Sequence, residues 1–205
     1  MEHRVVILPD AERDVEALAP EMREAILRLE EDGLVHAEGI LDAGCGPLTL
    51  ERYLDQSVHG IDMNPHMIEL ARTHSPWQGK NARVGYLSEL PEEWTGKFEL
   101  TVASLVLHWT SLRHVRGTLP DRMRILQQLV RITHPHGYVW LTFPLSVMTQ
   151  PVLARWVRAF SRMGFVIIKE LTGLVRARDV VARKRPFMFW SIYFSPNDSP
   201  CEVFK

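Results

Sequence analysis

The stretch that most constrains this chain is residues 39–49, which read Gly-Ile-Leu-Asp-Ala-Gly-Cys-Gly-Pro-Leu-Thr. Its apolar start predicts a short buried strand. Gly44 and Gly46 predict a tight turn whose main chain a ligand can approach closely. Pro47 suits the first turn of a helix, where its missing N–H would have no partner anyway. A strand that leads through such a turn into a helix is a place where α/β proteins bind small charged ligands.

Strand-like and helix-like segments alternate along the rest of the chain. We expect further strands at Val58–Asp62, Ala82–Tyr86, Phe98–Val106, Tyr138–Phe143, Phe165–Ile168 and Phe187–Phe194. We expect helices at Asp10–Asp32 with a break at Pro20, and at residues 48–54, 64–71, 119–134 and 151–163. This alternation predicts a doubly wound, mostly parallel sheet between two helical layers. The last two strands have no clear helix between them, which predicts an antiparallel hairpin at one edge.

The length of 205 residues fits one domain with an appendage. We therefore expect a helical cap or lid over residues 1–36 and the main domain over residues 37–205. Acidic residues gather in the first of these segments, and basic residues gather after Pro151, although the net charge is only −1. This asymmetry favours an anionic partner for the basic half.

The two cysteines, Cys45 and Cys201, form neither a disulfide framework nor a metal-binding spacing. We expect a reducing compartment, the cytoplasm, or the nucleus if the partner is a eukaryotic RNA. No stretch has the length of a membrane span, and the N-terminus lacks a signal-peptide pattern, so no membrane partner is expected. His134 and His136 flank a proline, but no carboxylate or cysteine completes a metal site with them, and no metal is expected.

An acidic residue stands at the end of the second predicted strand, about 20 residues after the first glycine turn. Asp62 there is placed to accept hydrogen bonds from the two hydroxyls of a ribose. A dinucleotide site would also need a third glycine three residues after Gly46, where Thr49 stands. Pro47 removes one N–H that a pyrophosphate would use. The pattern therefore favours a nucleoside ligand without a pyrophosphate.

Four blocks in order resemble the signatures of the class I, Rossmann-like S-adenosylmethionine-dependent methyltransferases. They are residues 41–47, 60–68, 98–109 and 131–138. The resemblance implies a seven-stranded sheet whose last strand is inserted antiparallel, and S-adenosylmethionine as the cofactor. It implies cofactor contacts at Asp42, Gly44, Cys45, Gly46, Asp62, Met63, Met67, Leu87, Ser88, Ser104 and Leu105. Two positions depart from the family pattern: Leu48 replaces a further glycine, and Tyr86 replaces an acid after the third strand.

Methyl transfer from a sulfonium needs positioning and a dry pocket more than acid–base help. A base is needed only if the acceptor is protonated, and His108, just after the fourth strand, is our candidate. The alternative is a histidine that packs on Trp109 or faces solvent. Arg183, Lys184 and Arg185 precede several aromatic residues. Cations beside rings suit single-stranded RNA, which we take as the favoured acceptor.

Two other functions are compatible with the same sequence. The acceptor can be a small molecule, with the N-terminal helix as a lid. The domain can also bind S-adenosylmethionine without catalysis, as a sensor or a structural subunit. The basic C-terminal stretch likewise has an alternative interpretation, as charges that guard an edge strand beside buried aromatic residues.

Overall fold

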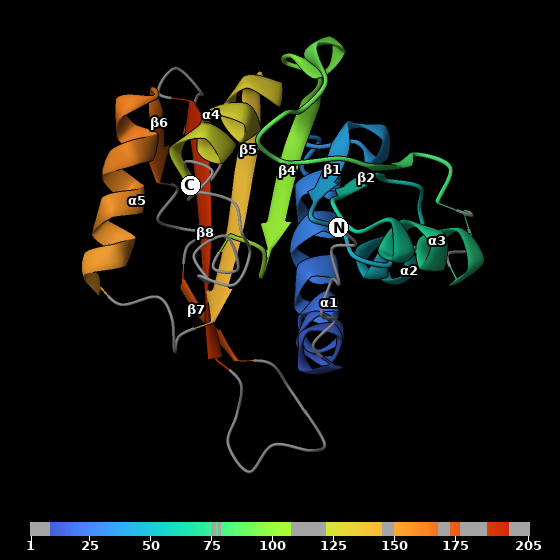
Figure 1. The fold of residues 1–205 in the computed structure, drawn as a ribbon. Coiled ribbons are helices and arrows are strands. Elements are labelled where there is room, and N and C mark those ends of the chain that lie inside the picture. The colour runs from blue at the N-terminus through green and yellow to red at the C-terminus, as the bar shows by residue number, and fades with distance from the viewer. Residues whose placement is uncertain are drawn as a thin grey trace, which may run out of the picture.

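In a computed structural model of the chain, helices cover both faces of a central sheet (Figure 1). The structure describes residues 9–74, 77, 79–107, 122–144, 150–167, 173–176 and 188–196. The helices are α1 (Pro9–Glu31), α2 (Thr49–Leu54), α3 (Pro65–His74), α4 (Arg122–Ile132) and α5 (Gln150–Arg162), with the 3₁₀ turns η1 (Ala37–Gly39) and η2 (Glu92–Trp94). The strands are β1 (Ile40–Ala43), β2 (His59–Asp62), β3 (Ala82–Val84), β4 (Phe98–Ser104), β5 (Thr133–Pro144), β6 (Phe165–Ile167), β7 (Gly173–Arg176) and β8 (Met188–Pro196).

The strand order is β3-β2-β1-β4-β5-β8-β6, and β7 also pairs with β8. The first five strands in this order are parallel, which confirms the predicted α/β class. β8 runs antiparallel to β5, β6 and β7. The described residues thus form eight strands rather than the expected seven. The last two expected strands, β6 and β8, pair antiparallel as predicted. They are not a simple hairpin, because β7 comes between them in the chain, and β8 lies between β5 on one side and β6 and β7 on the other.

Successive residues of the central strands point to opposite faces of the sheet, and each face has its own core. On β1, Ile40 belongs to a core with α1, α2 and α3, whereas Leu41 belongs to a core with α4 and α5. On β5, Trp140 and Leu141 divide in the same way. Because side chains alternate between the two faces of the sheet and both faces are buried, these strands are apolar almost throughout.

The N-terminal helix is continuous, so the expected break at Pro20 is wrong. A proline removes one hydrogen bond and clashes with the preceding turn, which costs about 3 kcal/mol or more in a helix interior. Leu18, Met22 and Ile26 are almost fully buried on either side of it. Burying each such side chain contributes roughly 1.5–3 kcal/mol, which is enough to hold the helix in place.

Strand β4 ends at Ser104, two residues earlier than expected, because Leu105 has a φ of 54° and leaves the extended conformation. β5 is longer than expected and begins at Thr133. Its first part pairs out of step with the rest, since a register shift separates the pair Phe98–Thr133 from the pair Leu100–Tyr138. In the described part of the chain, no helix is long and apolar enough to cross a membrane.

Candidate active site

The glycine turn after β1 is tied to the end of β2 by main-chain hydrogen bonds. The N–H groups of Gly44 and Cys45 donate to the carbonyl of Ile61, at 2.7 and 3.1 Å. β1 lies between β2 and β4, where the chain changes direction across the sheet. In open α/β sheets ligands bind outside the carboxyl ends of the strands at this switch point. The turn predicted from the sequence therefore sits where such a fold places its ligand.

Three residues of the turn have left-handed backbone conformations. Gly44 and Gly46 have φ values of 81° and 51°, which glycine adopts without strain. A Cβ atom on Gly44 would also lie 2.4 Å from a methyl group of Val106, so no larger residue fits there. A Cβ atom on Gly46 would face open space, which leaves its main chain accessible to a ligand. Leu48 has a φ of 56° although it is not glycine.

Asp62 links the glycine turn to the start of α3. Its Oδ2 accepts a hydrogen bond from the N–H of Gly46 at 2.9 Å, and its Oδ1 accepts one from the N–H of Asn64 at 2.8 Å. Burial raises the pKa of this half-buried carboxyl, while the two N–H donors act to lower it. A carboxylate has about four acceptor positions, so each oxygen can take one more donor. Two vicinal hydroxyls would match these two positions.

Acidic groups surround the inner end of the turn. Asp42 is buried on β1, and burial, reinforced by the charges of Asp62 and Glu51, raises its pKa to about 7. Glu51 is fully buried on α2 and accepts a hydrogen bond from the N–H of Val58 at 3.2 Å. Burial also raises the pKa of the Cys45 thiol, so this cysteine is a thiol and not a nucleophilic thiolate. When these carboxyl groups are ionised, the floor of the site carries negative charge, which favours a cationic ligand group.

A buried hydroxyl pair fixes the carboxyl end of β4. Ser104 Oγ and Thr142 Oγ1 are 2.9 Å apart, and the N–H of Leu105 donates to Thr142 Oγ1 at 3.2 Å. This N–H also lies 3.2 Å from the carbonyl oxygen of Thr142. These contacts hold Leu105 in its strained left-handed conformation. Thr142 could not be predicted from the sequence, because a threonine inside an apolar strand carries no signal beyond its β propensity.

The other predicted contact residues lie around the same edge of the sheet. Met63 is exposed directly after β2, and Met67 is half-buried on α3. Leu87 and Ser88 are half-buried in the segment after β3, which is joined to β2 because the N–H of Gly85 donates to the Asp62 carbonyl at 2.9 Å. The candidate base His108 and the candidate substrate-binding residues Arg183, Lys184 and Arg185 lie outside the described residues.

The segment after β3 is clamped by Arg131, at the end of α4. One guanidinium nitrogen donates to the carbonyls of Leu90 and Pro91, at 2.7 and 3.2 Å. The other donates to Thr95 Oγ1 at 2.6 Å. Arg131 therefore holds the loop that leads away from Leu87 and Ser88. This role of Arg131 could not be predicted from the sequence, because an arginine near a helix C-terminus is common for local electrostatic reasons.

Replacing Arg131 with methionine is expected to destabilise the fold by about 2 kcal/mol, because the partly buried carbonyls of Leu90 and Pro91 lose a charged donor. Urea denaturation followed by circular dichroism measures this change. Arg124→Met is the matched control, since its contact with Glu89 is long, at 3.9 Å, and exposed. We expect that control to lie within about 0.5 kcal/mol of the parent chain. Equal losses of stability in the two variants would contradict the role of Arg131 in holding this loop.

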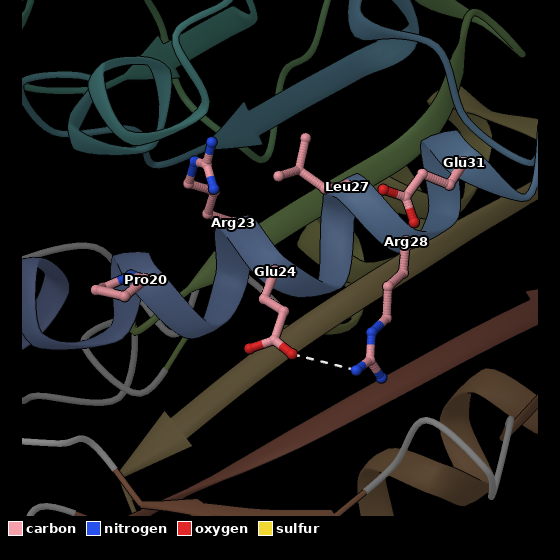
Figure 2. A pocket seen from close by; sticks show the side chains of 6 residues that line it. All are labelled: Pro20, Arg23, Glu24, Leu27, Arg28 and Glu31. Carbon is pink, nitrogen blue, oxygen red and sulfur yellow. Dashed lines mark hydrogen bonds and ion pairs between the residues drawn. The ribbon is translucent and has the colours of Figure 1, made fainter.

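A pocket away from the turn lies along α1 (Figure 2). Its side chains all come from this helix, and Glu24 pairs with Arg28 across it at 3.2 Å. None of the residues predicted for the cofactor or the acceptor lines it. Among the described residues there is also no group of three or more His, Cys, Asp or Glu side chains that could hold a metal ion.

Comparisons with known proteins agree with this geometry. A family model for the methyltransferase domain matches residues 41–141. A malonyl-[acyl-carrier protein] O-methyltransferase of Halorhodospira halophila is 34% identical over 132 residues, which are 62% of this chain and 41% of that protein. A trans-aconitate 2-methyltransferase of Methylobacterium radiotolerans is 29% identical over 131 residues, 60% of this chain and 44% of that protein. The chain spans less than half the length of these curated relatives.

Solved structures show the same fold. The magnesium protoporphyrin IX methyltransferase of Synechocystis PCC 6803, solved with bound S-adenosylmethionine, superposes with a TM-score of 0.60 at 16% identity. The superposition covers 92% of this chain and 85% of that one. The matched family region contains the glycine turn, Asp62 and the β4 end described above. Residues 41–141 therefore match the methyltransferase domain family, and the chain has the fold of S-adenosylmethionine-dependent methyltransferases.

Proposed function

We propose that this chain transfers a methyl group from S-adenosylmethionine to a small carboxylic acid. The observation that carries the cofactor assignment is the Asp62 carboxylate, held by Gly46 and Asn64 with one acceptor position left on each oxygen. These positions suit the ribose diol. The open main chain at Gly46 leaves room for the amino acid part of the cofactor. When bound, the cofactor supplies a methyl group already activated on a sulfonium.

The acceptor class rests on the relatives and on charge. The two curated relatives are named for acceptors that carry carboxyl groups, malonyl-[acyl-carrier protein] and trans-aconitate. The basic half of this sequence after residue 150 would complement an anionic acceptor. RNA is also anionic, and the basic and aromatic residues 176–193 support it as a second candidate. The relatives favour the small acid.

The role of the N-terminal segment follows from its packing. Leu18, Met22 and Ile26 of α1 lie in the same core as Ile40 of β1. This shared core supports one continuous domain, in which α1 is a layer of the fold. The division at residue 36 into a cap and a catalytic domain stays a prediction.

The acceptor is tested by supplying a tritiated methyl donor with malonyl-thioester, trans-aconitate or total RNA. We expect the labelled product to be a methyl ester of one of the two acids. Alkali should hydrolyse this product and release the label. Label in RNA instead would establish the second candidate. Binding of the cofactor without transfer to any of these acceptors or to a fractionated extract would support the sensor function.

Cofactor binding is tested at Asp62 by titration with S-adenosylhomocysteine. Asp62→Ala is expected to weaken binding tenfold or more, at least about 1.5 kcal/mol, because two charge-assisted hydrogen bonds to the ribose are lost. The affinity of Asp62→Asn should lie between those of the parent chain and Asp62→Ala, since asparagine keeps one acceptor oxygen. Asp55→Asn, at an exposed aspartate after α2, is the control and should bind normally. An unchanged affinity in Asp62→Ala would refute this cofactor site.

The role of His108 depends on the acceptor. A carboxylate is already ionised at neutral pH and needs no base. His108→Gln should then keep methyl transfer to an acid within a few-fold of the parent rate. A protonated acceptor would instead need the base, and its loss would lower kcat by about 10²- to 10⁴-fold. Single-turnover rates with each acceptor decide between these outcomes.

A further inference from the structure

The segment that leaves β4 begins with a strained residue that one residue of β5 holds. Leu105 has a φ of 54°, a left-handed conformation that is uncommon for any residue except glycine. Its N–H donates to Thr142 Oγ1 at 3.2 Å, and Ser104 Oγ lies 2.9 Å from the same hydroxyl. Thr142 is fully buried. Such strained residues persist only where their surroundings hold them, and they gather at functional sites.

The conformation of Leu105 directs the next two side chains to fixed places. Val106 is half-buried and lies against the main chain of the glycine turn, because a Cβ atom on Gly44 would lie 2.4 Å from its Cγ2. Leu107 is buried in the core that β4 shares with α4 and α5. An extended conformation at Leu105 would turn the chain in another direction and take Val106 away from Gly44. The contact between the end of β4 and the glycine turn therefore depends on the conformation of Leu105.

We propose that Thr142 is a positioning residue for methyl transfer, because its hydroxyl holds Leu105 in the left-handed conformation and thereby keeps Val106 against the glycine turn. This inference rests on the proposed function. In that function the turn holds the amino acid part of the cofactor, so the side chain of Val106 forms an apolar wall at its side. Such a wall excludes water from the reacting groups and limits the directions from which an acceptor can approach.

The glycine turn itself is held in place by β2. The N–H of Gly44 donates to the carbonyl of Ile61 at 2.7 Å, and the N–H of Gly46 donates to Asp62 at 2.9 Å. Loss of the Thr142 hydroxyl should therefore leave the turn where it is and displace only the apolar wall. We accordingly expect a slower transfer step with an almost unchanged cofactor affinity. A general loosening of the fold would instead lower both.

Thr142→Val tests this role, because valine keeps the shape of the side chain and lacks the hydroxyl. At saturating S-adenosylmethionine it should lower the single-turnover rate of methyl transfer about tenfold or more, because a small displacement in a site is costly. Its affinity for S-adenosylhomocysteine, measured by calorimetric titration, should stay within about threefold of that of the parent chain. Thr142→Ser keeps the hydroxyl and should restore the rate to within about threefold of the parent. The acceptor is whichever of malonyl-thioester, trans-aconitate and total RNA takes label from the parent chain.

Thr101 supplies the matched control. Its Oγ1 lies 2.9 Å from Thr133 Oγ1, so it forms the same kind of buried hydroxyl pair between β4 and β5. It is fully buried, as Thr142 is, but it lies inside β4 and not at the end of the strand. Thr101→Val should therefore keep the rate within about threefold of the parent. Thermal unfolding checks that both valine variants are folded at the temperature of the assay.

A second comparison tests the route through Leu105. Leu105→Gly loses a buried side chain, but glycine adopts a φ of 54° without strain. Adding Thr142→Val to this background should change the rate by less than about twofold, because the glycine no longer needs the hydroxyl to hold its conformation. A loss of the same size in the parent and in the Leu105→Gly background would overturn this route.

Each remaining outcome has a distinct meaning. Equal rates in Thr142→Val and Thr101→Val would overturn the positioning role while leaving the proposed function intact. An affinity for S-adenosylhomocysteine that falls as far as the rate in Thr142→Val would also overturn it, because the glycine turn would then depend on the hydroxyl. A folded parent chain that transfers label to none of the three acceptors would overturn the proposed function together with this inference.

Discussion

Replacing Asp42 with asparagine is expected to stabilise the folded chain by about 4 kcal/mol at pH 8 and to change its stability little at pH 4. Asp42 is buried on β1, and its pKa rises from 3.8 in the unfolded chain to about 7 in the folded chain. Above pH 7 the folded protein therefore keeps a charge in a poorly solvated place. Asparagine has nearly the shape of the protonated carboxyl and carries no charge.

The sign of this effect follows from proton binding. Between about pH 4 and pH 7 the folded state binds a proton at Asp42 that the unfolded state has released. Stability is therefore full below pH 4, falls as the pH rises through this window, and levels off above pH 7. The raised pKa of Asp62 also lowers stability as the pH rises, and it does so in both the parent and Asp42→Asn. The difference between variant and parent isolates Asp42.

Urea denaturation at pH values from 4 to 8 measures the two stability curves. The variant should lose less stability than the parent as the pH rises, and the gap should open between pH 4 and pH 7. Asp55→Asn, at an exposed aspartate, should follow the parent curve. Parallel curves for Asp42→Asn and the parent would show that Asp42 ionises in the folded state as it does in water.

Local sequence patterns predicted the parts of the site that depend on neighbouring residues. Gly44 and Gly46 were expected in a tight turn, and both have left-handed conformations there. Asp62 was expected at the end of the second strand, and it lies there against the turn. Alternating strands and helices also predicted the five parallel strands. In each case the residues that form the sequence pattern lie within a few positions of the structural feature that they predict.

Features that depend on distant residues could not be predicted in this way. Val139 of β5 pairs with Phe194 of β8, and the antiparallel insertion of β8 followed only from the resemblance to a family, because no local pattern in either strand indicates it. The contacts of Arg131 with Leu90 and Pro91 cross about 40 residues of sequence. The basic, aromatic composition of the C-terminal stretch favoured RNA as the acceptor. The relatives shift that inference to a small acid.

Leu48 combines a local conformation and a distant contact in one residue. It precedes α2 with φ 56° and ψ 47°, a conformation that costs a non-glycine residue roughly 1–2 kcal/mol. Its side chain is fully buried in the core with Ile40 and Val58. A Cβ atom on Gly60 would lie 2.7 Å from one of its methyl groups, so β2 approaches it closely. Packing therefore outweighs the strain that the glycine of other family members avoids.

Leu48→Ala is expected to destabilise the fold by about 3 kcal/mol, because a buried side chain is lost and the backbone strain remains. Leu48→Gly loses the same packing but also the strain, so it should be about 1 kcal/mol more stable than Leu48→Ala. Urea denaturation of the two variants and the parent measures both differences.

Leu18 supplies the matched control, because it is equally buried in the same core but lies inside α1. Glycine is less stable than alanine by about 1 kcal/mol in a helix interior. The order of the two variants should therefore reverse, with Leu18→Ala the more stable one there. If the alanine variant were the more stable one at both positions, the left-handed conformation of Leu48 would carry no cost. A reversal would show that packing against β2 holds a strained residue at the entrance to the cofactor turn.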